Sequence, residues 1–67
     1  MSVARVTEIS SRSEASFEAA INEGIDRAHQ TLRNVRSAWI KEQQVDIEDG
    51  RIVAYRVNML ITFVLDD

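Results

Sequence analysis

The sequence contains no cysteine and no proline, and its only glycines are Gly24 and Gly50. Without cysteine the chain has no disulfide framework and no thiolate metal site. With so few turn-forming residues there is little room for long loops or linkers. We therefore expect residues 1–67 to form a single domain, near the lower size limit for a chain that folds without such staples.

Charge and hydropathy argue against two classes of partner. Eight Lys and Arg against eleven Asp and Glu give a formal net charge of −3 at pH 7, whereas nucleic-acid binders normally present a basic face. No segment approaches the ~20 consecutive apolar residues of a membrane-spanning helix, and the N-terminus lacks the apolar core of a signal peptide. We expect no nucleic-acid partner, no membrane association and a cytoplasmic location.

The last third of the chain alternates without a break. One set of alternate positions is entirely apolar and consists of Val53, Tyr55, Val57, Met59, Ile61, Phe63 and Leu65. The intervening set is mixed and consists of Ile52, Ala54, Arg56, Asn58, Leu60, Thr62 and Val64. Because side chains alternate across a β-strand, this pattern predicts a long strand with one apolar face and one half-apolar face.

A helix is predicted upstream, where apolar residues recur every three or four positions. These residues are Phe17, Ile21, Ile25, Ala28 and Leu32. The helix N-cap is expected at Ser13, or at Ser11 through a capping box with Glu14. Gly24 lies inside the helix at a cost of about 1 kcal/mol relative to Ala, so we expect the helix backbone to pack closely there. Asn34 is the expected end signal.

Two more strands are predicted, one over residues 3–10 and one from Val35 to about Ile47. Asp49-Gly50 separates the second of these from the last strand and favours a two-residue type I′ hairpin turn. Such a turn sets the register of the two strands. The predicted facing pairs are Ile47–Ile52, Val45–Ala54, Gln43–Arg56, Lys41–Asn58, Trp39–Leu60 and Ser37–Thr62.

The resulting order β-α-β-β predicts an α+β fold with a three-stranded antiparallel sheet. The last strand is the most apolar and is expected in the middle, which makes the strand order 1-3-2. The helix is expected to cover the face that carries the apolar set from Tyr55 to Leu65. The residues predicted on the other face are Val35, Trp39, Val45, Ile47, Ile52, Leu60 and Val64, with Ser37, Lys41, Gln43, Arg56, Asn58 and Thr62.

One helix cannot cover both faces of this sheet. Apolar burial is worth about 25 cal/mol per Å², so leaving a Trp, a Leu and several Val in water forgoes several kcal/mol. Exposed patches of this kind usually mark association, which predicts that copies of the chain assemble with one another. The polar residues on the same face would suit a small-ligand pocket.

Several segments resemble the dodecin family over nearly the whole chain. The most telling are Ser16-Phe17-Glu18-Ala19-Ala20, Arg27-Ala28, Thr31-Leu32-Arg33-Asn34-Val35, Tyr55-Arg56-Val57 and Thr62-Phe63. Dodecins are small β-α-β-β subunits that form hollow dodecamers. Many bind flavins such as riboflavin or FMN in pairs at subunit interfaces, and some bind coenzyme A. The resemblance implies a homododecamer with a flavin storage or sequestration role.

The chain departs from the flavin-binding pattern of the family at two positions. Flavin-binding members stack a Trp of the second strand on the ring and hydrogen-bond it with a Gln of the third. Aligning through Thr31 to Val35 places Ser37 at the Trp position and Arg56 at the Gln position. Both changes weaken the case for standard flavin binding. The candidate ligand-binding residues are therefore Ser37, Trp39, Gln43 and Arg56.

Two of these candidates have alternative roles. Trp39 lies two residues along the same face and would stack on a ligand displaced by one pleat, or else anchor a subunit interface opposite Leu60. Arg56 is always charged and only donates hydrogen bonds, so it favours an anionic or carbonyl-rich ligand. Its alternative role is an interface salt bridge or a hydrogen bond to Gln43.

The sequence contains little that supports a catalytic function. His29 is the only histidine and lies off the apolar stripe of the helix, so no Ser-His-acid set can be assembled without it. We expect no enzyme activity. Glu42 and Asp46 are either solvated rim charges or carboxylates that bind Mg²⁺, Ca²⁺ or Na⁺ at symmetry axes between subunits.

Two hypotheses stand. The first is a cage that binds flavin, with Trp39 stacking on the ring and Arg56 and Gln43 supplying polar contacts. The second is a dodecin-like cage that has lost flavin binding and has a structural, ion-binding or other ligand role, with coenzyme A as an example. Yellow colour or quenched riboflavin fluorescence would distinguish the first from the second.

Overall fold

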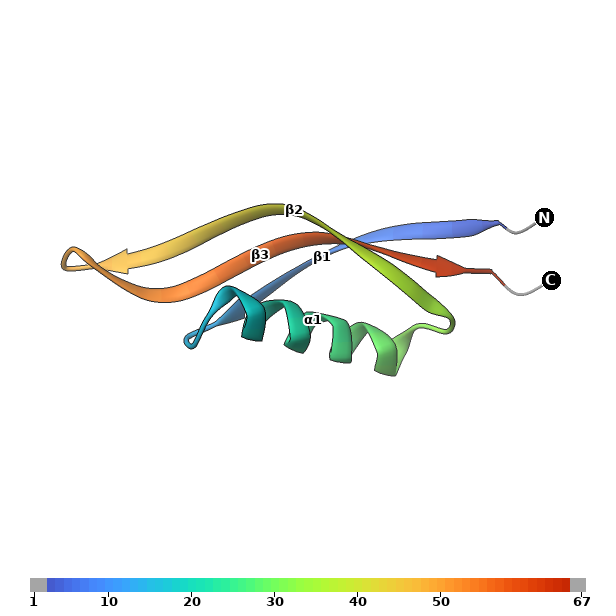
Figure 1. Cartoon of the computed structure of the whole chain (residues 1–67), viewed down its shortest axis with the longest axis horizontal. Coiled ribbons are helices and arrows are strands. Elements are labelled where there is room, and N and C mark those ends of the chain that lie inside the picture. The colour runs from blue at the N-terminus through green and yellow to red at the C-terminus, as the bar shows by residue number, and fades with distance from the viewer. Residues whose placement is uncertain (1–2, 66–67) are drawn as a thin grey trace.

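The computed structural model describes residues 3–65 and has one helix packed on one three-stranded sheet (Figure 1). Strand β1 spans Ala4–Ser13, helix α1 Phe17–Thr31, strand β2 Val35–Glu48 and strand β3 Arg51–Val64. The sheet is antiparallel with the order β1-β3-β2. The predicted α+β fold and strand order are confirmed. Over residues 3–65 no helix has the length and apolar character to cross a membrane.

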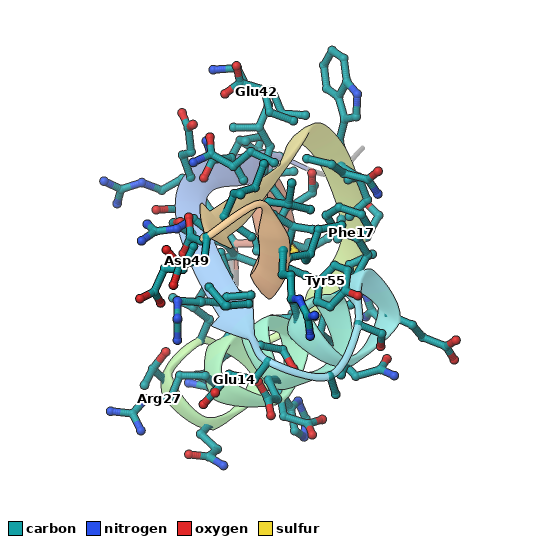
Figure 2. All side chains as sticks on the ribbon, turned by 90° about the vertical axis from the view of Figure 1, so that its left-hand side faces the viewer. Glu14, Phe17, Arg27, Glu42, Asp49 and Tyr55 are labelled. Atoms are coloured by element: carbon teal, nitrogen blue, oxygen red, sulfur yellow. The ribbon has the colours of Figure 1, made fainter. Side chains whose placement is uncertain are left out.

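The core lies between α1 and one face of β3, as the alternation in β3 predicts. Val57, Met59 and Ile61 are fully buried there, at alternate positions of the strand. The helix contributes buried small residues, including Ala20 and Gly24. At the edge of this core the rings of Phe17 and Tyr55 meet edge to face, with centroids 5.1 Å apart. Figure 2 shows the two rings side by side.

Gly24 marks the closest approach of helix and sheet. A Cβ atom at this position would clash with Cε of Met59 and lie 3.1 Å from Cβ of Ser11. The expected reason for a glycine inside the helix is therefore confirmed, since the backbone of α1 packs directly against β1 and β3.

The predicted start of the helix is wrong by three residues. Ser16 is the N-cap, and its hydroxyl oxygen accepts a hydrogen bond from the Ala19 amide at 2.9 Å. Ser13 instead ends β1 opposite Tyr55, and its hydroxyl accepts from the Ala15 amide at 3.1 Å. The first strand runs past its predicted end because β3 is long enough to pair with it throughout. Pairing with a central strand overrides the weak strand preference of a serine-rich segment.

The hairpin turn is the one predicted. Asp49 and Gly50 both have positive φ angles, 51° and 75°, as a type I′ turn requires. Next to the turn, Ile47 faces Ile52 as expected. At the other end of α1, Asn34 also has a positive φ of 61° and lies between the helix and β2, which agrees with its expected role as an end signal.

The predicted register fails in the middle of the hairpin. Register shifts lie between Asp46 and Ile47 and between Ile40 and Glu42, and a further shift lies near Val35. The first two are in opposite directions, so the register is displaced by one residue between them and then restored. The predicted pairs Trp39–Leu60 and Ser37–Thr62 are found, whereas the middle pairs are Glu42–Asn58, Gln43–Val57, Gln44–Arg56, Val45–Tyr55 and Asp46–Ala54.

This displacement changes which residues lie on the face without the helix. A one-residue slip moves a side chain to the opposite face. Gln43 and Val45 pair with Val57 and Tyr55, so they belong to the helix side of the sheet, against the prediction. Val35 also packs against the core cluster rather than on the opposite face. Lys41 falls at a register shift and has no facing partner.

Helix α1 covers only part of one face of the sheet. In Figure 1 the β2–β3 hairpin extends well beyond the start of α1, and among the elements of residues 3–65 none lies on the other face. The described part of the chain therefore keeps large apolar side chains in solvent: Val3, Val6, Trp39, Ile47, Ile52 and Leu65. Trp39 is 69% exposed, and the tip pair Ile47 and Ile52 are 62% and 53% exposed.

Candidate ligand-binding face

The face of the sheet opposite α1, here called the open face, is built from rows of residues that face one another across the three strands. Such residues point to the same side of a sheet. The rows, written β1–β3–β2, are Glu8–Leu60–Trp39, Ser10–Asn58–Glu42 and Arg12–Arg56–Gln44, flanked by Val6–Thr62–Ser37 at one end and by Ala54–Asp46 at the other.

One end of the open face is apolar. Trp39 lies opposite Leu60, with Val6 in the next row, and both Trp39 and Val6 are more than half exposed. Ser37 is exposed in the same row as Thr62. A hollow of about 200 Å³ lies apart from the open face, between α1 and the edge strand β2, and is lined by Ile25, Val35, Arg36, Ser37 and Ala38. Pockets for small-molecule ligands measure about 300–1,000 Å³, so a pocket for a flat cofactor needs more walls than one chain supplies.

The other end of the open face is charged. Asp46 accepts hydrogen bonds from Nε of Arg56 to both carboxylate oxygens at 3.1 Å, and from Nε of Arg12 at 3.2 Å. Hydrogen bonding from the two arginines, from Arg56 first and then from Arg12, holds the pKa of Asp46 below its ordinary value of 3.8. Asp46 is therefore ionised at neutral pH. The three side chains tie all three strands together.

The row between the two ends contains Glu42, whose Oε1 accepts a hydrogen bond from Nδ2 of Asn58 at 3.0 Å. In the neighbouring row of Trp39, Oε1 of Glu8 lies 3.5 Å from Nζ of Lys41. Figure 2 shows Glu42 on the side of the sheet away from α1, with Arg27 on the far side of the helix. Within residues 3–65 no three acidic or histidine side chains come close enough to hold a metal ion. His29 is exposed on the helix.

Three of the four predicted site residues share the open face. Ser37, Trp39 and Arg56 lie there, whereas Gln43 belongs to the helix side. Gln44 takes the place beside Arg56 that was expected for Gln43. Trp39 and Arg56 belong to rows four residues apart on β3, which at ~3.4 Å per residue separates them by about 14 Å.

Arg12 is a charged residue of this face that the sequence analysis did not identify as a site candidate. It lies directly opposite Arg56 and shares Asp46 with it. It lies beyond residue 10, the predicted end of the first strand, so only a longer first strand would have brought it to the sheet. Arg56 forms a salt bridge to Asp46 of the same chain. The predicted hydrogen bond to Gln43 is wrong, because Gln43 lies on the helix side of the sheet, and the predicted interface salt bridge stays a prediction.

Comparison with known proteins shows to which family this chain belongs. A family model described as Dodecin matches residues 3–66, almost the whole chain. The chain belongs to the dodecin family. The expected family membership and the fold that it implied are therefore both confirmed.

Individual dodecins match over their full length. The chain is 30% identical to calcium dodecin from Mycobacterium tuberculosis over 63 residues, which are 94% of this chain and 89% of that protein. A dodecin from Streptomyces davaonensis superposes with a TM-score of 0.93 at 36% identity, covering 98% of this chain and 97% of the other. An arginine-to-alanine mutant of T. thermophilus dodecin has a TM-score of 0.93 at 30% identity and full coverage of both chains.

Proposed function

We propose that this dodecin is a self-assembling small-ligand-binding protein that holds a flavin, riboflavin or FMN, between open faces of neighbouring copies. The observation that carries the proposal is Trp39, a Trp that is 69% exposed on a sheet face with no covering element in the described chain. We further predict a homododecamer with a storage or sequestration role, no catalysis, and a cytoplasmic location.

Assembly follows from the distribution of apolar surface. The helix buries one face of β3 and leaves Trp39, Val6 and the hairpin tip in water. In a folded monomer the exposed part of these side chains adds nothing to the free energy of folding, whereas each Å² of apolar surface that a neighbour covers stabilises the assembly by about 25 cal/mol. Membership of the dodecin family supports closure into a dodecamer.

Flavin binding rests on the chemistry of the open face. Trp39 offers an exposed aromatic ring on which a flat ring system can stack. Arg56 and Gln44 supply donors and one amide acceptor for the ring edge, and Ser37 supplies a hydroxyl in the row next to Trp39. The proposed site therefore keeps Ser37, Trp39 and Arg56, and Gln44 replaces Gln43.

The test is a riboflavin titration of purified protein followed by flavin fluorescence. Stacking on Trp39 should quench the fluorescence to saturation, and Trp39→Phe should retain more of the quenching than Trp39→Ala. Arg27→Ala, an exposed change on the outer side of α1, is the control and should leave the titration unchanged. A wild-type assembly that is colourless and leaves riboflavin and FMN fluorescence unaltered would rule out the flavin proposal.

A second candidate function is cation binding between subunits. The solved calcium dodecin from M. tuberculosis is described as calcium-chelating with a novel calcium-binding site, and it superposes with a TM-score of 0.82 at 29% identity, covering 96% of this chain and 91% of that one. Here Glu42 is an exposed carboxylate on the open face, and copies meeting at a symmetry axis would bring several together. Calorimetry with Ca²⁺ on wild type and Glu42→Gln tests this candidate, with Mg²⁺ and Na⁺ as competitors.

A further inference from the structure

The two register shifts on either side of Glu42–Asp46 cancel each other. In the hairpin, which the structure describes completely, Lys41 on β2 and Val53 on β3 have no facing residue. Each strand therefore has one extra residue, and the two extra residues lie at opposite ends of the segment. Beyond both ends, from Ser37 to Ile40 and from Ile47 to the turn, the pairs follow the register that the turn sets. Glu42–Asp46, here called the displaced segment, is out of step with the rest of β2 by one residue.

A second register is open to the same segment, here called the continuous register. A shift of the displaced segment by one residue would give both extra residues a partner and remove both bulges. Because such a shift turns every side chain of the segment to the other side of the sheet, it would also change the open face. The side chains of the segment that lie on that face now are Glu42, Gln44 and Asp46. In the continuous register Gln43 and Val45 would replace them, opposite Arg56 and Ala54.

The polar contacts of the displaced segment favour the observed register. Asp46 accepts from Nε of Arg56 at 3.1 Å and, across β3, from Nε of Arg12 at 3.2 Å. The side chain of Asp46 is 29% exposed, the least of the three, and hydrogen bonds between charged groups are among the strongest in proteins. Glu42 adds a hydrogen bond from Asn58 at 3.0 Å. In the continuous register both carboxylates would lie on the helix side, and all of these bonds would be lost.

We propose that Asp46 is a positioning residue, which holds β2 in the displaced register and so decides which residues line the open face. Without its bonds to the two arginines, the segment moves into the continuous register, which has no bulge to maintain. Gln43 then replaces Gln44 beside Arg56. This consequence for ligand contacts rests on the proposed function, whereas the register itself depends on no ligand.

The experiment is methyl NMR of the assembled protein, labelled at the methyl groups of Val and Ala. In wild type Val45 faces Tyr55, and Ala54 lies on the other side of the sheet, so the methyl groups of Val45 and Ala54 should give no cross-peak. In Asp46→Ala the two residues should face each other and give a strong cross-peak, because the Cβ atoms of facing residues lie ~5 Å apart. Glu48→Ala is the matched control, since it removes a carboxylate from β2 where the register is already the continuous one.

A riboflavin titration of the same proteins provides a second measurement, which a role in stability alone would not change. Gln44→Ala should weaken riboflavin binding by about two- to tenfold, the range for one neutral hydrogen bond, and Gln43→Ala should leave it unchanged. In the Asp46→Ala background the order should reverse. If riboflavin does not bind at all, the flavin function fails and the NMR comparison decides the register by itself.

Arg12→Gln keeps the test decisive if Asp46→Ala does not fold. It removes one of the two donors to Asp46 and leaves the sequence of β2 unchanged, so part of the same Val45–Ala54 cross-peak should appear. Wild-type spectra for both variants, or the cross-peak in Glu48→Ala as well, would overturn the inference. An unchanged order of the two glutamine variants in the Asp46→Ala background would also overturn it.

Discussion

Replacing Trp39 with Ala tests whether a neighbouring copy covers the open face. Burying a Trp side chain removes about 150–250 Å² from water, and 69% of this residue is exposed in one chain, so a neighbour would cover roughly 100–170 Å². At about 25 cal/mol per Å² this area contributes about 3–4 kcal/mol per copy. The same substitution in an isolated monomer would change the free energy of unfolding by no more than about 0.5 kcal/mol.

The assay is equilibrium unfolding of wild type and Trp39→Ala at two widely separated protein concentrations, with the mass of each sample measured by light scattering. Because assembly is linked to folding, the wild-type midpoint should rise with concentration. Trp39→Ala should have a lower midpoint and populate smaller species at the lower concentration, whereas Arg27→Ala should behave like wild type. An unchanged mass and an unchanged midpoint for Trp39→Ala would refute the covered-face reasoning.

Three further variants test the subunit itself. Asp46→Asn should be less stable than wild type at neutral pH. The difference in unfolding temperature between the two proteins should shrink as pH falls through the lowered pKa of Asp46, below its ordinary 3.8, because wild type then loses the same negative charge. A difference in unfolding temperature that stays constant down to pH 3 would contradict this. Ser16→Ala should lower the free energy of unfolding by about 0.5–2 kcal/mol through loss of the cap, measured by denaturant titration, and Ser13→Ala should not reproduce a helix-capping effect. Gly24→Leu should prevent α1 from packing on Met59, and a wild-type near-ultraviolet circular dichroism spectrum would show otherwise.

The fold could be predicted because its local signals agree with one another. The alternation in β3 identifies the buried set around Val57 and Ile61, and Asp49-Gly50 adopts the turn that its residue types favour. The apolar stripe of α1 correctly indicates one covered face. Each of these features is encoded by neighbours in the sequence, so no knowledge of distant contacts was needed.

The candidate site was harder to predict because it depends on register. Two compensating shifts in β2 and β3 place Gln44, not Gln43, beside Arg56, and a bulge of this kind has no strong sequence signal here. Arg12 was missed for a related reason: β1 continues through a serine-rich segment only because β3 is there to pair with it. Both errors concern contacts between strands, which local propensity does not report.

The most direct test of the central claim is the solution mass of the purified protein by size-exclusion chromatography with light scattering. A sheet with one face covered by α1 and the other left open should assemble, and a closed dodecamer of 7.6 kDa chains has a mass of about 91 kDa. A single species near that mass is the predicted result. A folded, stable 7.6 kDa monomer at micromolar concentration would contradict the account.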